Sequence, residues 1–174
     1  VLMASNNYLD IASHPSIKSA VVESTAMYGF GSGGSRLTTG NTVIHNALEN
    51  KIASYKETEA AIVFNTGYVA NVATISAMVK KGDTVFSDEL NHASIIDGCR
   101  LSKAKIVTYA HNDMDDLRKK IQENPCETGI VVSDAVFSMD GDILKFPEFL
   151  DICEENQLFS MVDEAHSTGV IGNC

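Results

Sequence analysis

The sequence lacks any apolar run long enough to cross a membrane. A membrane-spanning helix needs about 20 consecutive apolar residues, and charged or polar residues interrupt each apolar stretch of this 174-residue chain before that length. The chain also lacks a charged-then-apolar leader. Residues 1–3 already lie in an apolar run, so we expect the natural N-terminus to lie upstream. We therefore expect a cytoplasmic location and no membrane partner.

Basic residues are few. The chain has 13 Lys and Arg against 23 Asp and Glu, which gives a net charge of −10, and the basic residues form no stripe. Proteins that bind nucleic acid neutralise its phosphates with clustered Lys and Arg. This balance excludes a nucleic-acid partner and indicates a solvated acidic surface.

Cysteines are also few, and they stand apart at positions 99, 126, 153 and 174. No Cys-x-x-Cys pair occurs, and no Cys/His cluster has the spacing of a zinc site. The pattern therefore predicts no metal site. Scattered thiols are typical of a protein from a reducing compartment, which agrees with the cytoplasmic location.

The chain has no internal repeat, no low-complexity segment and no Pro-rich linker, and its glycines gather in GFGSGGSRLTTGN at 29–41. After that stretch, short apolar segments alternate with segments of helical periodicity. The predicted strands are 60–64, 83–88, 105–110, 129–137 and 158–163, and the predicted helices are 41–55, 67–79, 92–102, 114–124 and 146–156. This alternation is typical of βαβ units, and uninterrupted apolar strands are typical of sheets covered on both faces. The sequence therefore predicts a three-layer α/β/α domain with a mainly parallel sheet.

Polar residues collect just after four of the predicted strands. They are Asn65, Thr66, Gly67 and Tyr68 after 60–64, His92 after 83–88, Ser138 after 129–137, and Asp163 and His166 at the end of 158–163. Taken singly, each group is explained by an ordinary helix cap or turn. In open α/β sheets, however, ligands bind beyond the carboxyl ends of the strands. Because all four groups fall at that edge, we interpret them together as one binding site.

A planar, cationic partner that carries a phosphate would satisfy all four groups. The start of the helix at Gly67 suits a phosphate, the ring of His92 can stack on a planar cofactor, and a partly desolvated carboxylate such as Asp163 requires a cation. Pyridoxal 5'-phosphate (PLP) has these properties. A carboxylate against its ring nitrogen keeps that nitrogen protonated, and the protonated ring accepts electrons from a substrate carbanion. The residues therefore indicate PLP as the cofactor.

Eight stretches of the chain match motifs of one known family. They are SNNYLD (5–10), GSGGSRLTTGN (31–41), IHNALE (44–49), NTGYVAN (65–71), LNHASIIDG (90–98), AHND (110–113), VFSMDGD (136–142) and VDEAHSTGVIG (162–172). In this order, across essentially the whole chain, they resemble the α-oxoamine synthases, which are PLP-dependent acyltransferases. The resemblance implies the large domain of the PLP-dependent transferases of fold type I, the fold of aspartate aminotransferase.

The resemblance also implies roles for single residues. It implies that Thr66 contacts the cofactor and that the N–H groups of Gly67 and Tyr68 bind its phosphate. The ring of His92 is expected to stack on the cofactor ring, and Asp163 is expected to pair with the ring nitrogen. Ser138 and His166 are expected to contact the side of the ring that carries the hydroxyl. It implies a contact between Asn6 and the carboxylate of an amino-acid substrate. It further implies catalytic roles for His92, Asp163 and His166. The GSGGSR loop is expected near the active site of a homodimer.

The implied reaction condenses an amino acid, expected to be L-alanine, with an acyl-CoA, expected to be pimeloyl-CoA. Decarboxylation then gives an aminoketone, as in biotin biosynthesis. The stretch GSRLTTGN favours this branch of the family. Other branches share the motifs and stay alternatives: 2-amino-3-ketobutyrate CoA ligase, 5-aminolevulinate synthase and serine palmitoyltransferase.

The chain departs from the family pattern in two ways. Asp134 stands where members often carry Glu, which is a small change. The lysine that holds the cofactor covalently in the family follows the Asp/His motif by another strand or two, and none of the ten lysines of this chain fits its place. We therefore expect a truncated large domain: an N-terminal segment and glycine-rich loop at 1–40, part of the PLP-binding domain at 41–174, and no C-terminal domain.

The missing lysine opens a second interpretation. Without it we expect the chain alone to be inactive, and the chain could instead be a non-catalytic, cofactor-binding fragment. A nucleotide-binding α/β protein is a weaker alternative, because GFGSGGS follows no strand and no G-x-x-x-x-G-K-[ST] motif occurs.

Overall fold

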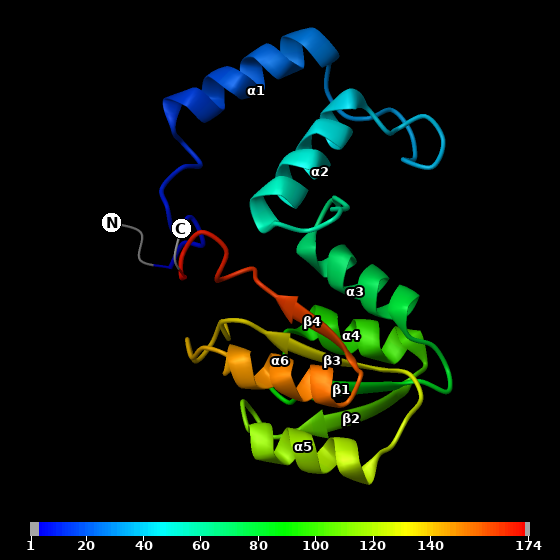
Figure 1. Cartoon of the computed structure of the whole chain (residues 1–174). Coiled ribbons are helices and arrows are strands. Elements are labelled where there is room, and N and C mark those ends of the chain that lie inside the picture. Colours follow the sequence, from blue (N-terminus) through cyan, green and yellow to red (C-terminus); the bar gives the residue numbers. More distant parts are fainter. Residues whose placement is uncertain (1–3, 173–174) are drawn as a thin grey trace. The chain divides into compact units, whose positions relative to one another are not determined.

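The structure is a computed structural model that describes residues 4–172 (Figure 1). It divides into two compact units, the first ending at Val63 and the second beginning at Phe64. The expectations for residues 1–3 and for Cys174 lie outside the described residues. The domain boundary expected between residues 40 and 41 stays a prediction.

The first unit contains a helix that the sequence analysis did not predict, α1 (Pro15–Tyr28). Its start has local causes. Pro15 suits the first turn of a helix, and the His14 side chain caps that turn by accepting the N–H of Ser16. Just after its end, the backbone of Gly29 has a φ of 80°, which glycine adopts without strain. None of its residues is buried, although Ile17, Val21 and Tyr28 share one face of the helix.

The second helix of this unit, α2 (Val43–Lys56), agrees with the prediction at 41–55. The glycine-rich loop before it is anchored by Arg36. The guanidinium donates to Glu49 Oε1 at 2.5 Å and to Asn41 Oδ1 at 2.7 Å. The hydrogen bond from Arg36 and a second one from the N–H of Val63 lower the pKa of Glu49 to about 2. The loop is thus fixed by an ion pair rather than by apolar packing.

The second unit carries a parallel sheet of four strands with the order β2-β1-β3-β4 (Figure 1). The strands are β1 (Thr84–Asp88), β2 (Lys105–Tyr109), β3 (Gly129–Asp134) and β4 (Phe159–Asp163), and the helices are α3 (Gly67–Met78), α4 (Ala93–Ser102), α5 (Met114–Glu123) and α6 (Phe146–Glu155). Each was predicted within a few residues. Every residue of β1 and β3 is buried, as expected for the central strands of a sheet covered on both faces.

The sheet of the second unit is covered by helices on both faces. One apolar cluster joins α5 and α6 to the sheet and contains Leu117, Phe149 and Val131. The other joins α3 and α4 to the opposite face and contains Ile75 and Ile95. The predicted three-layer α/β/α arrangement is confirmed. Within residues 4–172, no helix combines the length and the apolarity that crossing a bilayer requires.

One predicted strand is wrong. Residues 60–64 form no strand, although AAIVF is an apolar run. The backbone of Val63 is bound by side chains instead: its N–H donates to Glu49 Oε1 at 2.8 Å, and its carbonyl accepts from Arg36 at 3.1 Å. A strand exists only where a neighbouring strand supplies the ladder of hydrogen bonds. An apolar run by itself does not carry that information.

Candidate functional site

A cavity of about 380 Å³ lies at the carboxyl ends of β3 and β4, beside the start of α4. Strand β1 lies between β2 and β3, so the strand order reverses at this place. Ligand sites of open α/β sheets lie at the carboxyl ends of the strands next to such a reversal. Six of the predicted site residues line the cavity: Gly67, Tyr68, His92, Ser138, Asp163 and His166.

Helix α3 points its first turn at the cavity. Thr66 is its N-cap, and its hydroxyl oxygen accepts the N–H of Val69 at 3.1 Å. The N–H groups of Gly67 and Tyr68 have no acceptor within the helix, because first-turn donors never do. A Cβ added at Gly67 would meet no atom within 4 Å. The turn therefore offers two backbone donors and open space, which suits an anion such as a phosphate.

Asp163 ends β4 and lies half-buried at the cavity. Its Oδ1 accepts the N–H of Ala165 at 2.9 Å, and its Oδ2 accepts from Asn71 Nδ2 at 2.7 Å. The sequence analysis missed Asn71. Its spacing could have found it, because Asn71 follows Gly67 by four residues and thus shares a face of α3 with it. The carboxylate is held in place by donors from two elements.

The same network reaches His92, the N-cap of α4. Asn71 Nδ2 also donates to the hydroxyl of the buried Ser94 at 2.9 Å, and that hydroxyl lies 2.7 Å from His92 Nδ1. The backbone N–H of Ser94 donates to His92 Nδ1 at 3.2 Å. Because an N–H can only donate, Nδ1 is the acceptor and the ring proton is assigned to Nε2. Asp163, Asn71, Ser94 and His92 thus form one continuous chain of hydrogen bonds.

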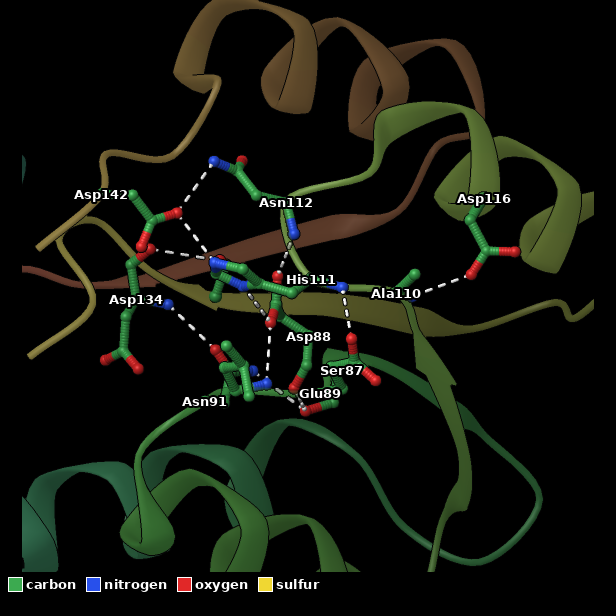
Figure 2. Close-up of polar contacts among 12 residues, drawn as sticks. Ser87, Asp88, Glu89, Asn91, Ala110, His111, Asn112, Asp116, Asp134 and Asp142 are labelled. Atoms are coloured by element: carbon green, nitrogen blue, oxygen red, sulfur yellow. Dashed lines mark hydrogen bonds and ion pairs between the residues drawn. The ribbon is translucent and has the colours of Figure 1, made fainter. Parts of the chain in front are cut away.

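A second carboxyl group faces the cavity, from Asp134 at the end of β3. It is directly paired with Asp163 in the β3–β4 ladder, and its Oδ2 accepts the N–H of His92 at 2.8 Å. Its own N–H donates to Asn91 (Figure 2). Burial, together with the negative charge of Asp163, raises the pKa of Asp134 to about 6. Two adjacent carboxyl groups give the cavity a negative character that suits a cationic ligand.

The raised pKa predicts a stabilising substitution. Asp134 binds its proton more tightly in the folded chain than in the unfolded chain, so stability falls as pH rises from about 4 through 6. We expect Asp134→Asn, which keeps an acceptor for His92, to raise Tm at pH 8 by about 2–4 °C. The gain should vanish at pH 4. Thermal unfolding followed by circular dichroism at both pH values measures it, and a gain that is equal at both would contradict the role of ionisation.

The other predicted residues take different positions. The phenol of Tyr68 donates to Asp97, which ties this side chain to α4 and raises the pKa of Tyr68. Ser138 lies in the loop after β3, and His166 in the turn after β4, and both line the cavity. Thr66 caps α3 without lining the cavity. Asn6 belongs to the first unit, so its contact with a substrate stays a prediction.

Known proteins of similar sequence and structure identify the family of this chain. The family model for aminotransferase class I and II matches residues 1–174. An 8-amino-7-oxononanoate synthase from Lysinibacillus sphaericus is 53% identical over 174 residues, which are 99% of this chain and 45% of that protein. The chain therefore spans less than half the length of this curated relative.

Two solved structures show the same relationship. A serine palmitoyltransferase from S. paucimobilis, with a bound PLP–myriocin aldimine, superposes with a TM-score of 0.93 at 37% identity over 97% of this chain and 44% of that one. An 8-amino-7-oxononanoate synthase from Francisella tularensis superposes with a TM-score of 0.80 at 32% identity over 97% of this chain and 46% of that one. The chain belongs to the aminotransferase class I and II family.

Proposed function

We propose that the cavity holds pyridoxal phosphate and that the chain is part of a PLP-dependent acyltransferase. One observation carries the proposal: the first turn of α3 and the carboxylate of Asp163 face one cavity and are joined through Asn71. A phosphate fits the N–H groups of Gly67 and Tyr68, and a protonated ring nitrogen fits Asp163. When bound, the protonated ring supplies an electron sink for a substrate carbanion.

The residues of the chain do the positioning in this proposal. The carboxylate of Asp163 keeps lone pairs for a ring N–H beyond those that Asn71 and Ala165 use. Nδ1 of His92 accepts the N–H of Ser94, and this bond holds the imidazole ring whose face is proposed to stack on the cofactor ring. Ser138 and His166 supply polar contacts from the loops after β3 and β4.

The proposed reaction joins L-alanine and pimeloyl-CoA, with loss of carbon dioxide, to give an aminoketone of biotin biosynthesis. The two 8-amino-7-oxononanoate synthases above support this branch. Because the chain is also 37% identical to the serine palmitoyltransferase, other pairs of acyl and amino-acid substrates stay alternatives. A homodimer in the cytoplasm, with the glycine-rich loop and Asn6 contributing to the active site, belongs to the same proposal.

A second candidate is a non-catalytic fragment that binds the cofactor. It is favoured by one observation: all ten lysines lie within residues 4–172, and none of them lines the cavity. Covalent attachment of PLP through a lysine of this cavity is then not possible in the chain as given. The two candidates differ in activity and not in the cofactor site, so the chain alone is expected to bind PLP and to catalyse no condensation.

A titration with PLP tests the proposal. We expect saturable, one-to-one binding, seen as a change in the visible absorbance of PLP, and no lysine adduct by mass spectrometry after borohydride reduction. A stoichiometric adduct on one lysine would contradict the assignment of the cavity. Absence of saturable binding would contradict the proposed cofactor site in this chain.

A further inference from the structure

The loop between β3 and α6, residues 135–145, carries Ser138 into the cavity and is folded back on itself. The N–H of Phe137 donates to the carbonyl of Asp142 at 3.1 Å, and the N–H of Gly141 donates to the carbonyl of Phe137 at 2.7 Å. At Gly141 the backbone has a φ of 76°, a conformation that favours glycine. Ser138 thus lies within a closed turn, and whatever holds Asp142 also sets the position of Ser138.

An imidazole joins Asp142 to the end of a neighbouring strand, and Asn112 Nδ2 also donates to Asp142 Oδ2 at 3.4 Å. His111, just after β2, places Nε2 2.8 Å from Asp142 Oδ2 and Nδ1 3.0 Å from Asp88 Oδ1, at the end of β1 (Figure 2). The ring of Phe137 also meets the His111 ring edge-on, with centroids 4.3 Å apart. The imidazole therefore touches the loop on both sides of Ser138.

The other end of this bridge is a buried carboxylate with further hydrogen bonds. The side chain of Asp88 is fully buried and also accepts the N–H groups of Leu90 and Asn112, at 2.9 and 2.8 Å. The N–H of His111 donates to Glu89 Oε1 at 3.0 Å. Figure 2 shows Asp88, Asn112 and Asp142 around His111. The loop is thus tied to β1, a buried central strand of the sheet.

Building on the proposed function, we propose that His111 is a positioning residue for the cofactor site. By bridging Asp88 and Asp142 it fixes the loop 135–145, so that Ser138 faces the cofactor. Here the five residues Asp88, His111, Asn112, Phe137 and Asp142 are called the loop latch. Asn112 supports the bridge, because its side chain donates to the carbonyl of Ile143 at 2.9 Å and accepts the N–H of Lys145 at 3.2 Å.

The charge of the latch gives it a pH dependence. Burial disfavours the imidazolium, but hydrogen bonds to Asp88 and Asp142 and the charges of these carboxylates outweigh burial and raise the pKa of His111. The other charged groups around this segment are Glu89, which binds the N–H of His111, and Asp116 of α5, which binds the N–H of Ala110. A histidine with a raised pKa contributes stability fully below its unfolded value near 6.5, and that stability is lost as pH rises through the folded value.

Hydrogen exchange of the chain tests the latch without any cofactor. His111→Gln keeps one donor nitrogen in place of the two ring nitrogens that bridge Asp88 and Asp142. We expect exchange at residues 136–144 to speed up at least about tenfold in this variant, relative to the intrinsic rates, and to stay unchanged in β1 and β3. Asp142→Asn should act in the same direction, whereas Asp140→Asn, an equal change of charge at an exposed position of the same loop, should not. Unchanged exchange in both latch variants would overturn the proposal.

A double-mutant cycle with PLP separates positioning from general stability. We expect His111→Gln and Ser138→Ala each to weaken PLP binding by about 3- to 10-fold, and the double variant to bind no more than about twofold worse than Ser138→Ala alone. Effects that multiply would overturn the link to Ser138, because a purely structural residue would weaken binding whether or not Ser138 is present. If the unmodified chain binds no PLP, the proposed function fails, and the exchange experiment still decides whether the latch holds the loop.

Discussion

Asp163→Asn is expected to weaken PLP binding by about 10- to 100-fold. A hydrogen bond to a charged group contributes about 1.5–3 kcal/mol, and each 1.4 kcal/mol is a factor of ten in affinity. Asparagine is nearly isosteric and can still accept from Asn71 or Ala165, which hold Asp163 at 2.7 and 2.9 Å. The loss then reports the missing negative charge rather than a collapsed site. Titration of the unmodified chain and of the variant with PLP, followed by the visible absorbance of PLP, measures this loss of affinity.

The same substitution should have a larger effect on turnover than on binding. The electron sink requires a protonated ring nitrogen, and in this proposal the carboxylate of Asp163 pairs with that nitrogen. In the longer protein that the family implies, we expect turnover to fall at least about 100-fold while some PLP stays bound, since tenfold corresponds to 1.36 kcal/mol of barrier. The matched control is Asp151→Asn, which removes the same charge from an exposed position of α6. Full turnover in Asp163→Asn would contradict the assigned role.

Replacing Gly67 or Gly98 by valine is expected to have opposite effects on the stability of the fold. A Cβ at Gly67 meets no atom within 4 Å, so the glycine there is required neither by packing nor by a positive φ. We expect Gly67→Val to lower PLP affinity at least about tenfold, because its branches fill the space proposed for the phosphate. Its effect on unfolding should be neutral or slightly stabilising, since valine has a higher helix propensity than glycine. Titration and thermal unfolding of the same preparation test both halves.

Gly98 provides the contrast. It lies on α4 where α3 packs, and its Cβ would lie 3.2 Å from the carbonyl oxygen of Asn71 and from the Cα of Val72. We expect Gly98→Val to cost about 1–3 kcal/mol of unfolding free energy. A Gly67→Val variant that binds PLP normally would show that the first turn of α3 is not the phosphate site, and one that unfolds as easily as Gly98→Val would contradict the open space at Gly67.

The arrangement of strands and helices in the second unit was predictable because it rests on local pattern. Runs such as TVFSD and GIVVSD are apolar on both faces, and they became the buried strands β1 and β3. The apolar pattern gave no prediction, or a wrong one, at two places in the chain. Helix α1 buries none of its residues and was not predicted, although His14 and Pro15 mark its start and Ile17, Val21 and Tyr28 share one face. Residues 60–64 are apolar, but their hydrogen bonds go to side chains of the first unit.

The sequence by itself determined the fold class, the family and the group of polar residues at one sheet edge, because periodicity and motifs are properties of neighbouring residues. Only the tertiary structure decided how these residues are held. Asn71 reaches Asp163 across 92 positions of the chain, and His111 reaches Asp142 across 31. Such contacts depend on the strand order β2-β1-β3-β4 and on its parallel register. No local pattern encodes that order, since it follows from how whole strands and helices pack against each other.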